Sequence, residues 1–181
     1  IYLRDEVMAD FPFATLLDKV AAISTLLTAL QRKLITGDSG CPGYLFDAPT
    51  QSTGKTTLAQ IISYSIYNRP AAATSWSNDD NELGKHILGI LREGHSCVLF
   101  DNVSNGTVLE SNELAKAMTS ATYSKRLLGE NKTVTVPSCV LWLFTGNNVS
   151  VAGDFNTRIL SIRLDAKMSD PDKRTFKRTD I

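Results

Sequence analysis

Apolar residues follow two patterns along the chain, and each pattern predicts a different kind of element. Between residues 15 and 34 they recur at steps of three and four, which is typical of an amphipathic helix. The positions are Leu16, Val20, Ile23, Leu27, Leu30 and Leu34. Further helices are predicted over residues 55–68, 79–93 and 109–121.

Short continuous apolar runs of strand length separate these helices. They cover residues 44–48, 96–101, 140–145 and 159–164, with a weaker candidate at 71–75. A hairpin is predicted over residues 126–135, with its turn at Gly129, Glu130 and Asn131. Continuous runs favour a sheet buried on both faces, and strands alternating with helices predict a parallel α/β domain. Ligands of such sheets bind beyond the carboxyl ends of the strands.

The predicted organisation is a helical lead-in at residues 1–38 packed on the core, a core over residues 39–166 and a tail at 167–181. The 181 residues suit one domain. With 43% hydrophobic and 21% charged residues, the composition excludes the disordered and collagen-like classes, and no apolar run is long enough to span a membrane. The balance of 19 basic and 19 acidic residues excludes a uniformly basic coat for nucleic acid, although a local basic patch stays open.

The three cysteines lie far apart and form no Cys-x-x-Cys pair, which argues against a zinc site or a disulfide framework. Cys97 and Cys139 lie in apolar runs and are expected to be buried free thiols. Free thiols suit a reducing compartment, so we expect a cytoplasmic protein.

The segment from Pro49 to Thr56 leads from the first predicted strand into a helix and resembles the P-loop, Gly-x-x-x-x-Gly-Lys-Ser/Thr, with Pro49 in place of the first glycine. Gly54 allows close approach of the backbone, Lys55 can reach the β- and γ-phosphates, and the Thr56 hydroxyl can bind Mg²⁺. The alternative is a solvated surface loop. The predicted ligands are ATP and Mg²⁺, and the binding residues are Gln51, Ser52, Thr53, Gly54, Lys55, Thr56 and Thr57.

Asp101 ends the third apolar run, where a Walker B acid would hold Mg²⁺. An ordinary acid at a strand end is the alternative. Asn102 follows, where many P-loop ATPases carry a glutamate that activates water; an amide can orient a water but cannot take its proton. The base is then Glu110 or Glu113, which lie nearby in sequence, or turnover is slow.

Two further strand ends carry candidate chemistry. After the fourth apolar run, Asn147, or as second choice Asn148, can hydrogen-bond the attacking water or the γ-phosphate, although the same residues also suit a plain turn. Before the last run, Arg158, or as second choice Arg163, can stabilise charge on a transferring phosphoryl group, although a surface salt bridge is the alternative.

Taken in order along residues 44–164, these motifs resemble the AAA+ ATPase core. The resemblance implies a three-layer P-loop NTPase fold with a five-stranded parallel sheet of order 5-1-4-3-2. It also implies a homo-oligomer, a hexameric ring in which Arg158 completes the site of the neighbouring copy.

Within that family the chain is most similar to ATPase domains of phage and mobile-element replication proteins, including the superfamily 3 helicases. Residues 145–148 resemble their motif C, and residues 123–129 resemble a segment common in phage-like ATPases. Superfamily 3 proteins place a DNA-touching hairpin where the hairpin is predicted here. The basic residues of the predicted hairpin, Lys125, Arg126 and Lys132, are therefore candidates for contacts with a nucleic-acid backbone. The alternative is a solvated charged hairpin.

The resemblance implies an ATP-hydrolysing motor, a helicase or translocase that acts on single-stranded or duplex DNA with replication proteins as partners. A helicase loader or protein remodeller is one alternative. The other is a nucleotide-gated assembly module that binds ATP and oligomerises but hardly turns over, because Asn102 replaces the base.

Overall fold

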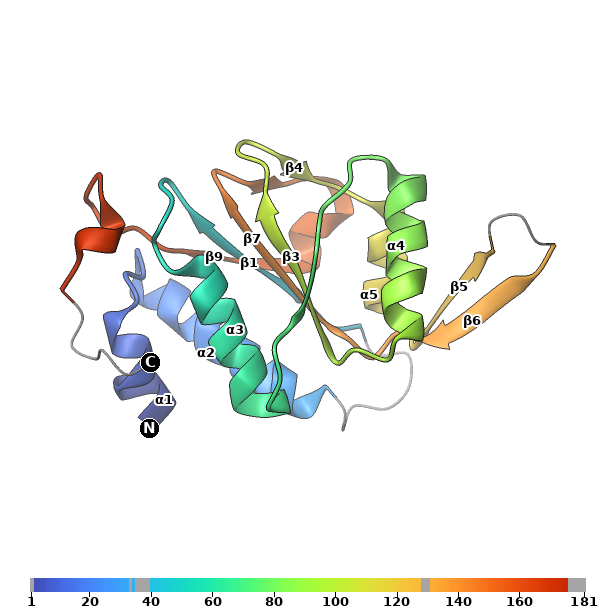
Figure 1. The fold of residues 1–181 in the computed structure, drawn as a ribbon, viewed down its shortest axis with the longest axis horizontal. Coiled ribbons are helices and arrows are strands. Elements are labelled where there is room, and N and C mark those ends of the chain that lie inside the picture. The colour runs from blue at the N-terminus through green and yellow to red at the C-terminus, as the bar shows by residue number, and fades with distance from the viewer. Residues whose placement is uncertain (1, 33, 35–39, 128–130, 176–181) are drawn as a thin grey trace.

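Five parallel strands form the centre of the molecule, with helices on both faces (Figure 1). The computed structural model describes residues 2–32, 34, 40–127 and 131–175. The strands are β1 (Gly43–Ala48), β2 (Ala72–Thr74), β3 (Cys97–Val103), β7 (Leu141–Asn147) and β9 (Ile159–Arg163). All adjacent pairs are parallel in the order β2-β3-β7-β1-β9, which is the expected 5-1-4-3-2 when only these five strands are numbered.

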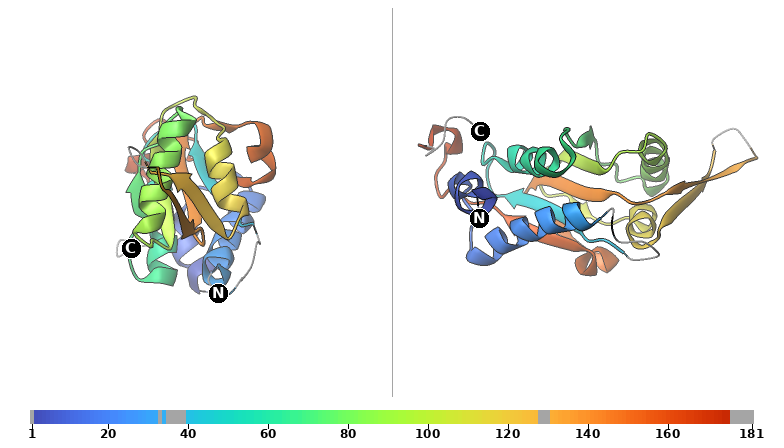
Figure 2. Two further views of the ribbon diagram at one scale, coloured as in Figure 1. Left: turned by 90° about the vertical axis from the view of Figure 1, so that its right-hand side faces the viewer. Right: turned by 90° about the horizontal axis from the view of Figure 1, so that it is seen from below.

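Three layers result, because a pair of helices covers each face of the sheet (Figure 2). The helices are α2 (Leu16–Gln31) and α3 (Lys55–Tyr67) on one face, and α4 (Asp80–Arg92) and α5 (Asn112–Thr119) on the other. Each face of the sheet has its own hydrophobic core, and successive residues of β1 belong to different cores. Tyr44 and Phe46 pack with α2 and α3, whereas Leu45 packs with α4 and α5. Burial on both faces explains the continuous apolar runs.

Short elements complete the described chain. They are α1 (Tyr2–Asp5), η1 (Val7–Asp10), β4 (Val108–Leu109), β8 (Ser150–Val151), η2 (Gly153–Thr157) and η3 (Pro171–Lys173). None of the helices formed by the described residues has the length and apolar character needed to cross a membrane.

The predicted helix over residues 109–121 is wrong at its start. Leu109 belongs to β4, which pairs in parallel with β8. The helix begins only after Ser111, whose hydroxyl accepts a hydrogen bond from the Leu114 amide at 3.0 Å and so caps α5. Pairing with a strand 42 residues further along is a long-range contact that no local pattern contains.

The hairpin is longer than predicted. Its strands are β5 (Thr122–Arg126) and β6 (Thr133–Pro137), paired antiparallel, so Tyr123 belongs to a strand. Of the predicted turn residues, Gly129 and Glu130 lie outside the described residues. The hairpin projects from the body of the molecule (Figure 1). Among the cysteines, Cys97 is buried as expected, but Cys139 is exposed.

Helix α2 packs on the sheet with the opposite face to the one that its sequence indicates. Its buried residues are Ala22, Thr25, Leu26 and Ala29. Most of the apolar stripe that predicted the helix is exposed instead, including Leu16 at 77% and Leu30 at 58%. Small residues allow the helix to lie close to β9 and β1, and this close packing outweighs the burial of the larger side chains.

Candidate functional site

The loop that follows β1 forms the floor of a cleft at the carboxyl edge of the sheet. Two of its residues have left-handed backbone conformations, Ser52 with φ 58° and Gly54 with φ 93°. Such turns point successive amides into one concavity, where an anion can be bound at the start of α3. A Cβ atom on Gly54 would lie 3.2 Å from the ring of Phe11, so the loop packs closely on the N-terminal segment.

The cleft has a volume of about 310 Å³, and its surface is more polar than apolar. It is lined by Gln51, Ser52, Thr53, Gly54, Lys55, Thr56, Thr57, Asn102, Thr145 and Asn147. The structure therefore brings all seven predicted binding residues together with Asn102 and Asn147.

Lys55 is the first residue of α3 and the cation of this cleft. Only 8% of the residue is exposed, yet within the described part of the chain its ammonium bonds to neutral oxygens alone, Thr50 O and Thr53 Oγ1, both at 3.3 Å. Burial lowers the pKa of Lys55, and the charges of Asp47 and Asp101 oppose this shift without cancelling it. An anion in the cleft would supply the missing counter-charge.

Asp101 lies beside the cleft within a cluster of hydroxyl groups. Its Oδ1 accepts hydrogen bonds from Thr56 Oγ1 at 2.8 Å and from Thr145 Oγ1 at 2.5 Å. The Thr145 hydroxyl in turn accepts a hydrogen bond from the backbone N–H of Asn102 at 2.9 Å. The register of β3 against β7 shifts between Phe100 and Val103, and Asn102 has φ 54° there. This irregularity sets Asp101 and Asn102 apart from the regular strand at the edge of the cleft.

The donor set at this point suits Mg²⁺. The Thr56 hydroxyl and the Asp101 carboxylate supply hard oxygen atoms, and Mg²⁺ sites beside phosphates use one or two carboxylates with other oxygens. Within the described part of the chain, no group of three or more His, Cys, Asp or Glu side chains could hold a metal on its own. A metal here would thus require oxygens from a bound phosphate or from water.

Asn147 and Asn148, at the end of β7, occupy different positions. Asn147 lines the cleft, whereas the Asn148 amide donates to Asn105 Oδ1 at 3.0 Å and to Pro49 O at 3.5 Å. Asn148 thereby ties the loop after β1 to the turn after β3. This geometry favours Asn147 as the amide that can meet a ligand.

Arg158 lies at the opposite edge of the sheet from the cleft. Its carbonyl accepts a bond from Gly43, the first residue of β1, whereas the loop follows the last residue, Ala48. The separation along the strand is about 17 Å for five residues. The guanidinium bonds to Asp154 O at 2.8 Å, and its buried Nε has no partner among the described residues. Arg158 therefore cannot reach the cleft of its own copy.

Neither acid proposed as a base lies in the cleft. Glu113 accepts bonds from Lys125 at 3.1 Å and from the Tyr123 hydroxyl, at the base of the hairpin. Glu110 lies against η2, since a Cβ on Gly153 would come within 2.7 Å of its Oε1. No carboxylate is among the residues that line the cleft.

The three basic residues of the hairpin also differ from one another. Lys125 points back to the body and is 16% exposed in its ion pair with Glu113. Arg126 and Lys132 are exposed further along the hairpin. Contact of these residues with nucleic acid stays a prediction.

Sequence reasoning missed two residues that organise the site. Asp47 is buried in β1, where its carboxylate accepts bonds from the Val149 amide at 2.9 Å and from Arg163. It links β1 to β9 and to the turn after Asn147, while Arg163 is used in this ion pair. Thr145 bridges Asp101 and Asn102. The only signal for Asp47 was a charge inside an apolar run.

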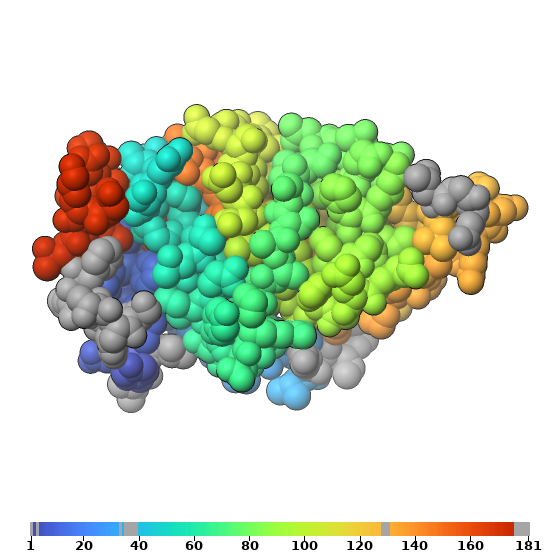
Figure 3. Space-filling view, viewed as in Figure 1, coloured from blue at the N-terminus to red at the C-terminus, as the bar shows by residue number. Residues whose placement is uncertain are grey.

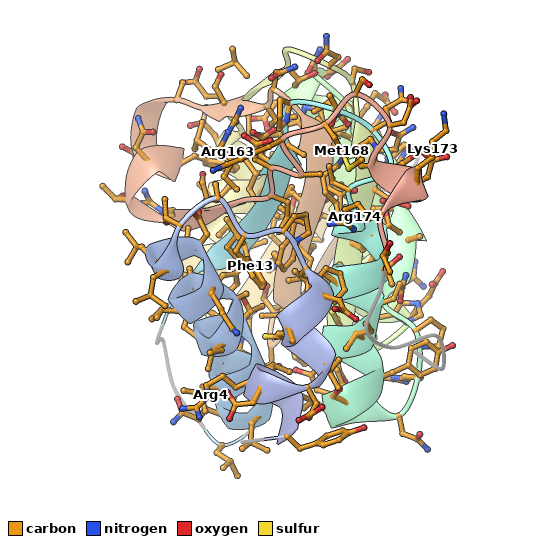
Figure 4. The ribbon with its side chains drawn as sticks, turned by 90° about the vertical axis from the view of Figure 1, so that its left-hand side faces the viewer. Arg4, Phe13, Arg163, Met168, Lys173 and Arg174 are labelled. Carbon is orange, nitrogen blue, oxygen red and sulfur yellow. The ribbon has the colours of Figure 1, made fainter. Side chains whose placement is uncertain are left out.

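The C-terminal segment reaches the same loop from the other side. Arg174 Nη2 lies 3.4 Å from Thr53 O, to which it donates. In Figure 3 this segment, in red, stands beside the loop before α3. Phe13 and Arg174 lie on the same side of the molecule (Figure 4).

In comparisons with known proteins, no family model matches the sequence and no curated protein matches it.

Proposed function

We propose that the chain is an ATP-hydrolysing P-loop domain of the AAA+ type, the motor of a DNA helicase or translocase in a replication protein of the phage or mobile-element kind. The observation that carries the proposal is a buried lysine, 8% exposed, which has no ion pair with a carboxylate among the residues that the structure describes and lies in a polar cleft beside the Thr56–Asp101–Thr145 cluster. The strand order supports the same fold assignment.

In this proposal each cleft residue has a defined part. Lys55 exchanges its two neutral oxygens for β- and γ-phosphate oxygens, and the loop amides hold the remaining charge. Thr56 and Asp101 would hold Mg²⁺, which when bound neutralises charge on the phosphates. Asn147 orients a water toward the γ-phosphate. Because no carboxylate lines the cleft, the rate depends on positioning and charge stabilisation and should be slow.

The deciding experiment measures ATP hydrolysis by the chain with and without single-stranded DNA. We expect Mg²⁺-dependent turnover that DNA stimulates and that Lys55→Ala abolishes. Stimulation by a protein partner alone would favour a loader or remodeller. Failure to bind ATP at all would contradict the proposal at its root.

One observation favours a second candidate, the nucleotide-gated assembly module. The amide of Asn102 stands at the cleft where a base is expected, and no acid replaces it. Tight ATP binding with negligible turnover, unchanged in Asn102→Glu, would support this candidate. A gain of turnover in Asn102→Glu would instead support a hydrolase that lacks only its base.

The position of Arg158 supports action in a neighbouring copy of a ring. Mixing Lys55→Ala with Arg158→Ala chains should restore part of the activity, because each copy supplies what the other lacks. Full turnover by Arg158→Ala alone would exclude this role.

The hairpin is proposed to follow a nucleic-acid backbone through Lys132 and Arg126. Lys132→Ala should lower the slope of log affinity against log salt by about 1. Lys173→Ala is the matched control. Lys173 is an exposed lysine outside the hairpin, and its ammonium lies 2.7 Å from the Asp170 carboxylate. Equal salt slopes for both variants would show that the hairpin does not contact the nucleic acid.

A further inference from the structure

The exposed stripe of α2 has the spacing of a helix-pairing seam. Its positions within the helix are separated by 4, 3, 4 and 3 residues: Leu16, Val20, Ile23, Leu27 and Leu30. This average of 3.5 is the repeat of two helices wound on each other. Ile23 is half-buried, and the other four are 52% to 77% exposed. The side chains on the outer side of α2 project away from the sheet (Figure 4).

Apolar side chains surround α2 almost completely. Its 16 residues include only two with a charge, Asp18 and Lys19. Asp18 is used in the helix cap with Thr15 and accepts a bond from the Arg163 amide at 2.8 Å. One face of α2 is already buried against the sheet. A helix that is apolar on all sides is normally covered on all sides, so the outer face lacks its partner in a single copy.

We propose that this seam pairs with α2 of a second copy of the chain in an antiparallel arrangement. The spacing 3-4-3 of the last four seam positions reads the same in both directions, so a two-fold axis at position 25 sets each of them against another. Val20 then faces Leu30 of the other copy, and Ile23 faces Leu27. A surface that matches itself in this way is the mark of an isologous contact.

Charge favours the antiparallel direction over the parallel one. In a parallel pair both copies of Lys19 stand at the same level of the seam, where their like charges repel. In the antiparallel pair they are 12 residues apart along the axis, about 18 Å, and the helix dipoles oppose each other. The seam itself contains no charged residue.

The area offered is suited to a reversible dimer. Leu160 of the edge strand β9 is a further exposed apolar side chain, at 45%. The exposed apolar side chains together offer on the order of several hundred Å², beyond scattered surface leucines. Specific interfaces bury about 800 Å² on each partner, so the pair lies at the lower end of that range.

Sedimentation velocity on the full chain tests the pairing. We expect a shift from monomer to dimer between about 1 and 100 µM. Leu27→Glu, in the seam, should raise the dissociation constant at least about ten-fold, since it buries a charge. Leu17→Glu is the matched control: Leu17 is on the same helix and 77% exposed, but lies off the seam. Circular dichroism verifies that both variants fold. A wild-type chain that stays monomeric, or a control that disrupts equally, overturns the proposal.

Cross-linking tests the direction. Cys41 and Cys97 are buried, so Cys139→Ser removes the exposed thiol. In that background a mixture of Val20→Cys and Leu30→Cys chains should form a disulfide-linked heterodimer, whereas Val20→Cys alone should not. A disulfide between two Val20→Cys chains without the mixed product would overturn the antiparallel arrangement, and the absence of any cross-link would overturn the pair.

Discussion

Two largely buried lysines of this protein are in opposite electrostatic situations. Lys125, at the base of the hairpin, forms an ion pair with Glu113 at 3.1 Å. Lys55, in the cleft, has no carboxylate within 4.0 Å among the described residues and bonds to two neutral oxygens. Lys125 is paired directly with a carboxylate, whereas Asp47 and Asp101 act on Lys55 through their charge alone.

This difference separates a structural cation from a binding one. A buried charge without a partner costs folding free energy, so a protein keeps it only where something else supplies the counter-charge. In the proposed function, an anion bound at the cleft and its loop amides does so at Lys55. At Lys125 the counter-charge is already present, and a nucleic-acid phosphate would have to displace Glu113.

The sharpest test of this contrast is Lys55→Met. We expect nucleotide binding to fall by about 100-fold or more, because the main counter-charge to the phosphates is lost. Without ligand the variant should be more stable by about 1 kcal/mol, a rise of roughly 3 °C in Tm, since an unpaired buried charge is removed. Titration with a fluorescent ATP analogue and thermal melting measure the two effects. A variant that both binds normally and melts lower would refute the contrast.

Asp101→Asn tests the acid beside Lys55. The amide has nearly the same shape and can still accept bonds from Thr56 and Thr145, but it lacks the charge that attracts a divalent cation. Mg²⁺-dependent hydrolysis should fall by about 100-fold, with nucleotide binding in EDTA unchanged. Asp170→Asn, an exposed acid paired with Lys173, is the control. Loss of binding in EDTA would mean that Asp101 shapes the loop rather than holding a metal.

The sheet and its edge chemistry could be predicted from the sequence because they depend on local pattern. Continuous apolar runs identified four of the five parallel strands, and β2 was only a weaker candidate. The residues at the strand ends meet at one edge, as with Lys55, Asp101 and Asn147. What could not be predicted depends on long-range contacts. The β4–β8 pair, the ion pair of Asp47 with Arg163 and the cluster at Thr145 join residues 42 or more positions apart.

Side-chain orientation was the other limit. The period of α2 identified a helix but not which face meets the sheet, because small residues on the opposite face pack more closely. The charge of Lys125 predicted an outward-facing group, yet Tyr123 and Glu113 turn it toward α4 and α5. A period locates an apolar face; its partner depends on tertiary structure.

Lys125→Met is the counterpart of the change at Lys55. It should lower the stability by about 1–2 kcal/mol, or roughly 3–6 °C in Tm, because Glu113 loses its closest cation in a partly buried position. ATP binding should be unchanged. Lys116→Met removes the more exposed partner of Glu113 at 3.3 Å and should cost less. Equal losses in the two variants would mean that burial does not distinguish the two pairs.

The smallest effect should appear in the pH dependence of stability at Glu113. Burial raises the pKa of Glu113, but the Tyr123 hydroxyl and the charges of Lys125 and Lys116 outweigh it and lower the pKa overall. A lowered folded pKa means that the ionised carboxylate stabilises the fold at pH values above its ordinary pKa of about 4.3, and that this stability is lost as the pH falls through the folded pKa.

Urea titrations should therefore show a difference in the free energy of unfolding between wild type and Glu113→Gln that is constant above about pH 5 and narrows below about pH 4. A difference at Glu113 that widened on acidification would show that burial, not the ion pair, controls this carboxylate.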